Sequence, residues 1–311
     1  MVQAHEFTFP STDGVHEIRA VRWAPEGKPR AAVQLVHGIA EHILRYEDFA
    51  RFLAERGFLV TGNDHLGHGG SCKSPEEQGF FKESGGWDTV VADVRRLYDE
   101  TRAAYPDIPY FILGHSMGSF ILRTFLIRYN KAPLAGAIIS GTGYYAPPVS
   151  KMGEMLSAFE VWRHGPRGTS SVFQALSSKP YNKRFRPNRT AFDWLSRDER
   201  VVDKYIADSA CGFAPSSSMV RDMMGGVGFI CSGKNVAEME KALPILFVSG
   251  GEDPVGSYGK GVKKVYEMFL AAGCSDVTLK LYPGGRHEML NELNRDEVYH
   301  DLLSWLEKKE K

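Results

Sequence analysis

The chain has 311 residues, which is enough for one large α/β domain with an insertion or for two small domains. Its 38 lysine and arginine residues balance its 38 aspartate and glutamate residues, and hydrophobic residues make up 43% of the chain. This balance does not suggest a surface that binds polyanions, so we expect no nucleic acid as a partner.

Residues 31–140 alternate between short apolar runs and stretches with helical spacing. Each apolar run has the length of a buried strand, and each helical stretch repeats its apolar residues at intervals of three and four. Gly57 and Pro106 follow two of the helical stretches and are expected to end them. We expect strands at 31–36, 58–63, 109–113 and 135–140, and helices at 46–54, 87–105 and 119–126.

The alternation stops near residue 144 and resumes near residue 243. The later part predicts strands at 244–249 and 277–282, with a helix at 261–272 between them. Strands that alternate with helices favour a parallel sheet covered by helices on both faces. The predicted fold class is therefore α/β, with a mostly parallel central sheet flanked by helices.

Residues 144–242 contain prolines, serines, basic residues and short helical patches, but no strand rhythm. Because the α/β pattern resumes afterwards and completes the same sheet, we interpret this segment as a helical cap insertion. It is expected over the carboxyl ends of the strands, where ligands bind in such sheets. The core then consists of residues 1–143 and 243–311, and residues 144–242 are called the insertion below. A separate domain is the alternative.

A candidate nucleophile lies between the predicted strand at 109–113 and the predicted helix at 119–126. Residues 114–118 read Gly-His-Ser-Met-Gly, which fits the pattern G-x-S-x-G. A sharp turn between strand and helix projects the serine hydroxyl above the sheet, and the glycines are needed because the turn leaves no room for side chains. We therefore predict Ser116 as a nucleophile. The alternative is an ordinary tight turn.

A serine hydroxyl needs a base, and the base needs an acid that orients it. In a sheet of this kind the acid follows a late strand and the histidine follows the last strand. Asp253 and His287 occupy these two places. The neighbouring Glu252 competes with Asp253. We favour Asp253 because Asp253-Pro254 starts the next turn and directs the carboxylate inward.

The tetrahedral intermediate of acyl transfer also needs backbone amides that face its oxyanion. One is the amide after the nucleophile, which belongs to Met117. The other is expected in the loop after the first core strand, where Ile39 is the best candidate. Gly38 in the same loop allows the backbone to turn close to the substrate.

Histidines in two loops raise the question of a metal site. His37 and His42 have no set of Asp, Glu or His at ligand spacing, so we interpret them as structural or supporting residues. Asp64 and His68 lie in a glycine-rich turn and are expected to make internal hydrogen bonds. We expect no metal.

The chain carries no signal for export. Residues 1–6 lack both the basic and the apolar regions of a signal peptide, and no apolar run approaches the roughly 20 residues that cross a bilayer. Four scattered cysteines without a C-x-x-C pair are then expected to be free thiols. We predict a cytoplasmic protein.

Two groups of side chains stand out in the insertion. The apolar group surrounds the glycine-rich residues 225–228 and suits either an adaptable channel for an acyl chain or an ordinary core. It consists of Phe173, Phe213, Met219, Met223, Met224, Phe229 and Ile230. The basic group suits an anionic head group, a transient contact with an anionic membrane surface, or a solvated face. It consists of Arg163, Arg167, Lys183, Arg184, Arg186 and Arg189.

Together these motifs resemble the α/β-hydrolase superfamily, and more narrowly its monoacylglycerol lipase and lysophospholipase branch, which is sometimes grouped with serine aminopeptidases. The resemblance covers nearly the whole chain. It rests on residues 35–42, 45–46, 64–69, 114–118, 249–255 and 282–288, and on 192–198 and 205–208 in the insertion.

The resemblance implies hydrolysis of carboxylic esters without a cofactor by Ser116, Asp253 and His287. The implied partner is a small-molecule ester or a lipid. The framework does not determine which one, because lipases, esterases, thioesterases and aminopeptidases share it. The residues expected to contact the substrate are Gly38, Glu41, His115, Phe213 and Met223.

Other functions remain compatible with the same residues. A short-chain carboxylesterase or an aminopeptidase would use the same three residues. An aminopeptidase also needs an acidic anchor for the substrate amine, for which Glu41 is the obvious candidate. A hydrolase-fold protein that binds a small ligand without turnover is a further alternative, although such proteins often lack one of the three residues.

Overall fold

The computed structural model describes residues 2–176 and 178–310. These residues contain an eight-stranded sheet with the strand order β1-β2-β4-β3-β5-β6-β7-β8. β2 pairs antiparallel with β1 and with β4, and the other neighbours pair parallel. The predicted α/β class is confirmed. The strands are β1 (Gln3–Pro10), β2 (Glu17–Ala24), β3 (Ala31–Val36), β4 (Phe58–Asn63), β5 (Tyr110–His115), β6 (Gly136–Ser140), β7 (Ile245–Gly250) and β8 (Val277–Tyr282).

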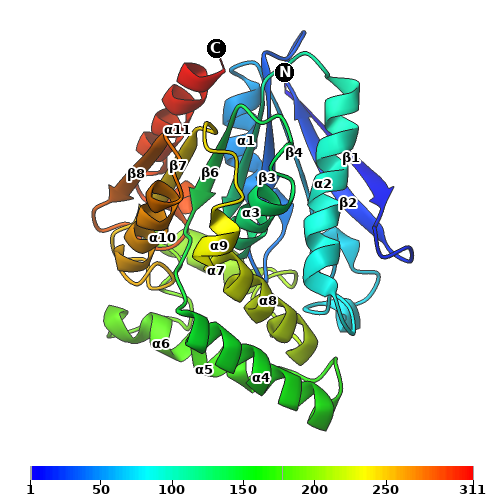
Figure 1. The fold of residues 1–311 in the computed structure, drawn as a ribbon, viewed down its shortest axis with the longest axis vertical. Coiled ribbons are helices and arrows are strands. Elements are labelled where there is room, and N and C mark those ends of the chain that lie inside the picture. The colour runs from blue at the N-terminus through cyan, green and yellow to red at the C-terminus, as the bar shows by residue number, and fades with distance from the viewer. Residues whose placement is uncertain (1, 177, 311) are drawn as a thin grey trace.

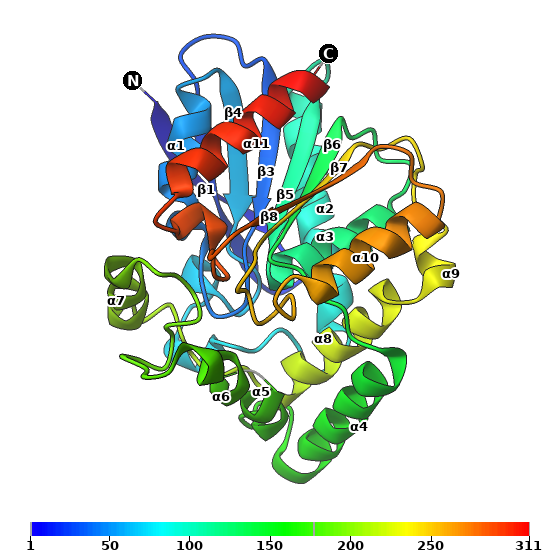
Figure 2. The same ribbon diagram turned by 90° about the vertical axis from the view of Figure 1, so that its left-hand side faces the viewer.

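Helices cover both faces of the sheet (Figure 1, Figure 2). α1 and α11 lie on one face, and α2, α3 and α10 lie on the other. The two faces follow from the alternation of side chains along each strand. In β3, Val33 and Leu35 join the cluster under α1 and α11, whereas Ala32 and Val36 join the cluster under α2 and α3. The bounds are α1 (Glu47–Ala54), α2 (Gly86–Ala104), α3 (Met117–Arg128), α10 (Lys260–Ala271) and α11 (Arg295–Lys309).

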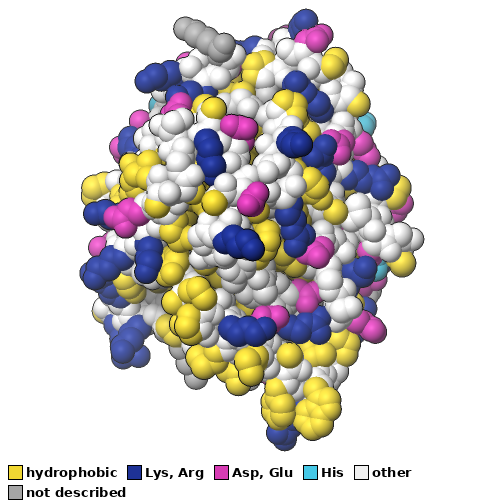
Figure 3. Space-filling model, in the orientation of Figure 1, with side chains coloured by type: hydrophobic (Ala, Val, Ile, Leu, Met, Phe, Trp, Pro, Cys, Tyr) yellow, Lys and Arg dark blue, Asp and Glu magenta, His cyan; other side chains and the backbone are white. Residues whose placement is uncertain are grey.

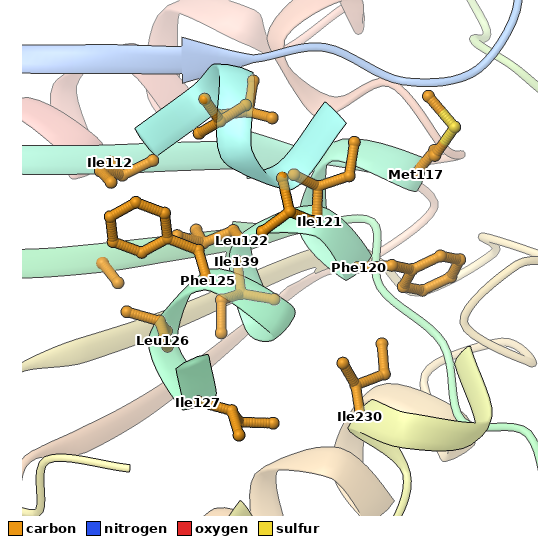
Figure 4. Packing of buried hydrophobic residues seen from close by; sticks show 14 of the residues in the cluster. Ile112, Met117, Phe120, Ile121, Leu122, Phe125, Leu126, Ile127, Ile139 and Ile230 are labelled. Atoms are coloured by element: carbon orange, nitrogen blue, oxygen red, sulfur yellow. The ribbon is translucent and has the colours of Figure 1, made fainter. Parts of the chain in front are cut away.

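α3 is buried along almost its whole length, which fixes its first residue at the carboxyl end of β5. In Figure 4, Leu122 and Phe125 of α3 lie beside Ile139 of β6 in the same hydrophobic cluster. Arg123 is also buried within this helix. Its guanidinium donates hydrogen bonds to Gly143 O and Ile230 O at 3.0 Å each, which ties α3 to the insertion.

The insertion is helical in its described residues and lies between β6 and β7, which are neighbours in the sheet. α8 and α9 pack into the same hydrophobic cluster as α3 through residues such as Val227 and Val236. α4, α5 and α6 lie at the end of the molecule beyond the sheet (Figure 2). The bounds are α4 (Pro147–His164), α5 (Ser171–Leu176), α6 (Ser178–Asn182), α7 (Glu199–Ala207), α8 (Ser217–Ile230) and α9 (Gly233–Val236).

Two parts of the fold differ from the sequence-based expectation. β1 and β2 extend the sheet as an antiparallel hairpin at its edge, and α11 covers one face after the last strand. Neither had been predicted. Within residues 2–176 and 178–310, no helix combines the length and the apolar character that a membrane span requires. Short 3-10 helices occur at Ile43–Tyr46, Gly69–Ser71, Pro75–Glu77, Lys183–Phe185 and Met289–Asn291.

Candidate active site

Ser116 occupies the turn between β5 and α3. Its φ of 55° and ψ of −121° are strained for a residue with a side chain. A Cβ added at Gly114 would lie 2.4 Å from Gly118 O, and one added at Gly118 would lie 2.0 Å from Val36 O. The two glycines therefore permit the turn, and the turn holds Ser116 at the carboxyl end of the sheet.

His287 and Asp253 form a buried pair. His287 Nδ1 donates a hydrogen bond to Asp253 Oδ1 at 3.0 Å. The carboxylate also accepts hydrogen bonds from the Val255 amide at 2.9 Å and from the Ser249 hydroxyl at 3.2 Å. Because Nδ1 carries the proton that faces Asp253, Nε2 is free to accept another proton.

The pair shifts both pKa values. Burial alone would lower the pKa of His287, but the charge of Asp253 and its hydrogen bond outweigh burial and raise that pKa above its ordinary value. Burial alone would raise the pKa of Asp253. The charge and hydrogen bond of His287, with the Val255 amide, outweigh burial and lower it. Asp253 is therefore ionised at neutral pH and favours a protonated His287.

The competing acid Glu252 has a different partner. Its carboxylate lies 3.5 Å from the guanidinium of Arg184 in the insertion. The structure thus brings Asp253, and not Glu252, to His287.

Ser116 and His287 line the same cavity, although within the described part of the chain Ser116 Oγ makes no hydrogen bond with His287. Such contacts often tighten only when a substrate is bound.

Two backbone amides lie close to Ser116. Met117 is the first residue of α3, so its amide has no acceptor within the helix. Gly38 approaches from the loop after β3, and a Cβ added there would lie 3.0 Å from Ser116 Cβ. The Gly38 amide donates to Glu41 Oε1 at 2.6 Å, so it is not available to an oxyanion. Both Ile39 and Met117 line the cavity.

Arg45 joins two carboxylates beside the cavity. It donates to Glu41 at 2.5 Å and to the two oxygens of Glu288 at 2.8 and 2.6 Å. Glu41 also accepts from the Tyr46 hydroxyl at 2.8 Å. Burial would raise the pKa of Glu41, but Arg45 and the other donors outweigh it and lower that pKa. Arg45 thereby ties the loop after β3 to the residue that follows His287.

A cavity of about 320 Å³ opens between the core and the insertion and reaches Ser116 and His287. This volume lies in the range of ligand sites, and most of the wall is apolar. The residues expected to contact the substrate all lie in the wall: Gly38, Glu41, His115, Phe213 and Met223. Further lining residues from the insertion are Tyr145, Phe173, Tyr181, Phe192, Trp194, Leu195, Tyr205, Pro215, Val220, Met224 and Val227. Met219, Phe229 and Ile230 of the same apolar group do not line this cavity: Met219 and Ile230 are buried in the core cluster, and Phe229 packs against it.

Three histidines pack beneath the loop after β3. The ring centroid of His37 lies 4.0 Å from that of His65 and 5.3 Å from that of His68. All three are fully buried. Burial lowers the pKa of each, to about 4 for His68, so the three rings are neutral at pH 7. They support the loop as uncharged packing groups.

The glycine-rich turn after β4 is organised by its own side chains. Asp64 accepts hydrogen bonds from the amides of Ile43 and Gly70 at 2.8 Å each. His68 Nδ1 donates to Leu66 O at 3.1 Å. The internal hydrogen bonds that were predicted for Asp64 and His68 are confirmed.

Among the described residues, His42, Asp208 and Cys211 form a group that could hold a metal ion, with ligand atoms within 4.8 Å of one another. His42 Nε2 and Asp208 Oδ2 are 2.8 Å apart and share a hydrogen bond. Burial raises the pKa of the Cys211 thiol, which opposes the thiolate that a metal requires. The sequence did not reveal this group because the insertion supplies two of its members.

The loop that carries His287 is attached to the insertion. The His287 amide donates to Trp194 O at 3.4 Å, and the next amide donates to Leu195 O at 2.8 Å. Arg286 donates to two further carbonyls of the same segment. The Trp194 ring also packs on the imidazole. Trp194 was missed as a site residue, and its only signal was its place in the segment 192–198.

The chain is similar to known lipases and esterases along nearly its whole length. It is 28% identical over 310 residues to the monoacylglycerol lipase of Mycolicibacterium smegmatis, with 97% of this chain and 96% of the relative covered. It is 28% identical over 297 residues to the monoglyceride lipase of Homo sapiens, with 91% and 84% covered. A thermostable carboxyl esterase from Bacillus coagulans, solved in complex with glycerol, matches with a TM-score of 0.92 at 29% identity and full coverage of both chains.

A family model matches as well. The model described as serine aminopeptidase, S33 (Hydrolase_4) matches residues 27–294. This span contains the loop after β3, the turn at Ser116, the insertion, Asp253 and His287. Together with the eight-stranded, mostly parallel sheet, the match shows that the chain belongs to the S33 serine aminopeptidase family (Hydrolase_4) of α/β-hydrolase proteins.

Proposed function

We propose that the chain is a serine hydrolase that cleaves carboxylic esters, with monoacylglycerol-like or lysophospholipid-like lipid esters as its substrates. Ser116 attacks the ester carbonyl while its proton passes to His287, which Asp253 orients. The amides of Ile39 and Met117 hold the oxyanion. Water activated by His287 then releases the acid from the acyl-enzyme.

The observation that carries this proposal is the place of the Asp253–His287 pair at the wall of an apolar cavity that also reaches Ser116. Transfer of an acyl chain from water into this cavity favours binding by about 0.8 kcal/mol for each buried methylene. The names of the relatives support a carboxylic ester hydrolase, and those of the two lipases favour a monoacylglycerol.

The charges in the cavity favour an ester over a peptide. Of the described residues that line it, Glu41 and Glu288 carry carboxylates beside the reacting groups, and Arg45 pairs with both. Glu41 also accepts hydrogen bonds from the Gly38 amide and the Tyr46 hydroxyl. A peptide ammonium group would have to displace Arg45 from a buried pair. We therefore propose an esterase, although the family is named after an aminopeptidase.

We further infer that the insertion contacts an anionic membrane surface. α4 packs on α8 through small residues such as Gly153, while its other side exposes large apolar side chains. In Figure 3, yellow side chains gather at the lower end of the molecule, where α4 lies in Figure 1. The exposed residues are Val149, Met152, Met155, Leu156, Phe159 and Trp162.

The position of α4 would place a membrane, as the source of the lipid substrate, near the cavity. A helix with an exposed apolar side and neighbouring basic side chains is typical of helices that lie in the membrane interface. The basic residues on α4 are Lys151, which pairs with Glu154 on the same helix, and Arg163 and His164 in its last turn. α5 borders a surface groove of about 430 Å³ with α4, and through Phe173 it also borders the active-site cavity. A lipid ester that leaves the membrane would therefore have a short path to Ser116.

The test compares the native chain with Ser116→Ala on aryl esters from acetyl to palmitoyl, on monoacylglycerols and on aminoacyl arylamides. Loss of Ser116 should lower kcat on the order of a million-fold. A medium- or long-chain optimum that vanishes in the variant supports the proposal. A short-chain optimum would replace it with a general carboxylesterase, and hydrolysis of arylamides alone with an aminopeptidase. No hydrolysis, and no labelling of Ser116 by a fluorophosphonate, would indicate a binding protein.

A further inference from the structure

His287 lies against two aromatic rings, one of which comes from the insertion. The centroid of the Trp194 indole is 5.0 Å from that of the His287 imidazole, with 40° between the planes. The other ring is that of His115, whose centroid is 4.6 Å away. His287 is only 2% exposed. A charge that forms on its imidazole therefore depends on its protein neighbours, among them the carboxylates of Asp253, Glu288 and Glu41, more than on water.

The two rings act differently on a proton at His287. The face of an indole carries partial negative charge and attracts a cation within about 6 Å of its centroid. His115 would repel a cation if it were itself protonated. Burial lowers the pKa of His115 to about 4, so its ring is neutral at pH 7. Trp194 and Asp253 therefore both favour the charged form of His287, and His115 does not oppose it.

Trp194 is held in place by its backbone and by ring packing. Its amide donates to Asn182 Oδ1 at 3.0 Å, and its carbonyl accepts from the His287 amide at 3.4 Å. Its ring packs against Tyr181, with centroids 5.0 Å apart. The indole nitrogen is buried and, in the described part of the chain, makes no hydrogen bond. The position of the ring is thus fixed without the indole N–H.

We propose that Trp194 is a positioning residue whose ring face stabilises the imidazolium form of His287 during ester hydrolysis. The proposal rests on the proposed function, because it requires His287 as the base. In acylation, Ser116 Oγ bonds to the carbonyl carbon, its proton moves to His287 Nε2, and the carbonyl electron pair moves to the oxygen held by Ile39 and Met117. The proton then moves to the departing alcohol as the C–O bond breaks. Because the imidazolium forms only during these steps, the ring raises kcat.

The first experiment measures kcat, KM and the pH dependence of kcat/KM for Trp194→Leu and Trp194→Phe with a soluble aryl ester. Trp194→Leu should lower kcat about two- to thirty-fold, with a smaller change in KM. The acid limb of kcat/KM reports the pKa of His287 in the free enzyme. It should move to lower pH by roughly half a unit to one and a half units, with Trp194→Phe intermediate.

If Trp194 only shields His287 from water, the acid limb of kcat/KM should move in the opposite direction. Burial lowers the pKa of His287, so water admitted beside it would raise that pKa and move the acid limb to higher pH. A limb that moves upward or stays in place overturns the proposal. Trp305→Leu is the matched control: Trp305 lies on α11 against Phe111, and its indole nitrogen is likewise buried without a hydrogen bond in the described part of the chain. This control should leave the limb in place.

A second measurement covers the case in which Trp194→Leu fails to fold. Fluorotryptophan in place of tryptophan weakens the ring face while keeping its shape, so it should move the acid limb to lower pH. The same replacement in the Trp194→Phe chain should have no effect, and equal effects in both chains would refute the proposal. Turnover that persists in Ser116→Ala would refute the proposed function itself. Turnover that requires Ser116 but ignores Trp194 would refute only this inference.

Discussion

Arg45 donates two hydrogen bonds, at 2.8 and 2.6 Å, to the carboxylate of Glu288, which directly follows His287. The two residues are 243 positions apart in the chain. The same guanidinium donates a hydrogen bond to Glu41, whose carboxylate also accepts a hydrogen bond from the Gly38 amide. One side chain therefore joins the loop after β3, which carries the proposed oxyanion donor Ile39, to the loop of the proposed base His287.

Replacement of Arg45 by methionine leaves the buried carboxylates of Glu41 and Glu288 without the positive charge that joins them. We expect the free energy of unfolding to fall by about 3–5 kcal/mol, and kcat to fall with it. Urea unfolding measures the first quantity. The control is Arg51→Met, because Arg51 forms an exposed pair with Glu47 and should cost less than about 1 kcal/mol. Equal losses in the two variants would contradict the bridging role of Arg45.

Gly38→Ala tests the approach of the oxyanion loop to the nucleophile. The new Cβ would lie 2.7 Å from Glu41 Oε1 and 3.0 Å from Ser116 Cβ, so the loop must move. We expect kcat to fall by about 10²- to 10³-fold with a smaller change in KM, because an oxyanion donor is displaced. Steady-state kinetics measure both quantities. Gly233→Ala is the control, since nothing lies within 4 Å of the added Cβ there. Native kcat in Gly38→Ala would rule out this loop as a donor.

The buried histidines predict loss of stability in mild acid. His68 and His115 have pKa values lowered to about 4 from an ordinary value near 6.5. Between these values the unfolded chain binds protons that the folded chain does not, so stability is present above about pH 6.5 and is lost as pH falls toward 4. Each histidine contributes a slope of up to about 1.4 kcal/mol per pH unit.

Urea unfolding across this pH range checks the slope. His68→Leu removes one of the titrating groups, so the free energy of unfolding of this variant should depend less steeply on pH than that of the native chain. The comparison of slopes separates the titration of His68 from any loss of packing, because lost packing lowers stability equally at each pH. Identical slopes would show that His68 is not kept neutral by the fold.

The exposed side of α4 predicts binding to anionic vesicles. Phe159→Ser combined with Trp162→Ser removes two large apolar contacts, one of them 79% exposed. We expect the double variant to cosediment less with vesicles that contain phosphatidylglycerol, and added salt to weaken the remaining binding. The control is Val15→Ser, which removes an apolar side chain that is 73% exposed in the loop between β1 and β2, outside the insertion. If both variants bind as the native chain does, α4 is not the contact surface.

Sequence alone predicted the part of the fold in which burial produces a local pattern. The strands β3 and β8 have the predicted bounds, because six-residue apolar or alternating runs stop at loop residues on both sides. The turn that carries Ser116 was predicted from its two glycines, and the structure shows that Gly114 and Gly118 have no room for a side chain. β1 was not predicted because most of its residues are exposed, so no periodic apolar signal marks it.

The remaining features depend on contacts between distant parts of the chain. The sequence favoured Asp253 over Glu252 from the Asp253-Pro254 turn, but the contact of Asp253 with His287 and the pairing of Arg45 with Glu288 depend on the packing of distant loops. Residues 192–198 contributed to the family resemblance, but the sequence did not predict a role for any of them. The proposed role of Trp194 follows only from the fold, which places its ring against that of His287, 93 positions further along the chain.

The attachment of the His287 loop to residues 193–196 has a consequence for engineering and for evolution. The insertion is not expected to be exchangeable between relatives as an independent module, because part of it holds the loop of the proposed base His287. A chimera should keep residues 192–198 with its own histidine loop and exchange only the helices on either side. If the proposed function holds, substitutions in residues 192–198 that change the fit of an acyl chain would also change the rate, so specificity and turnover would evolve together in this segment.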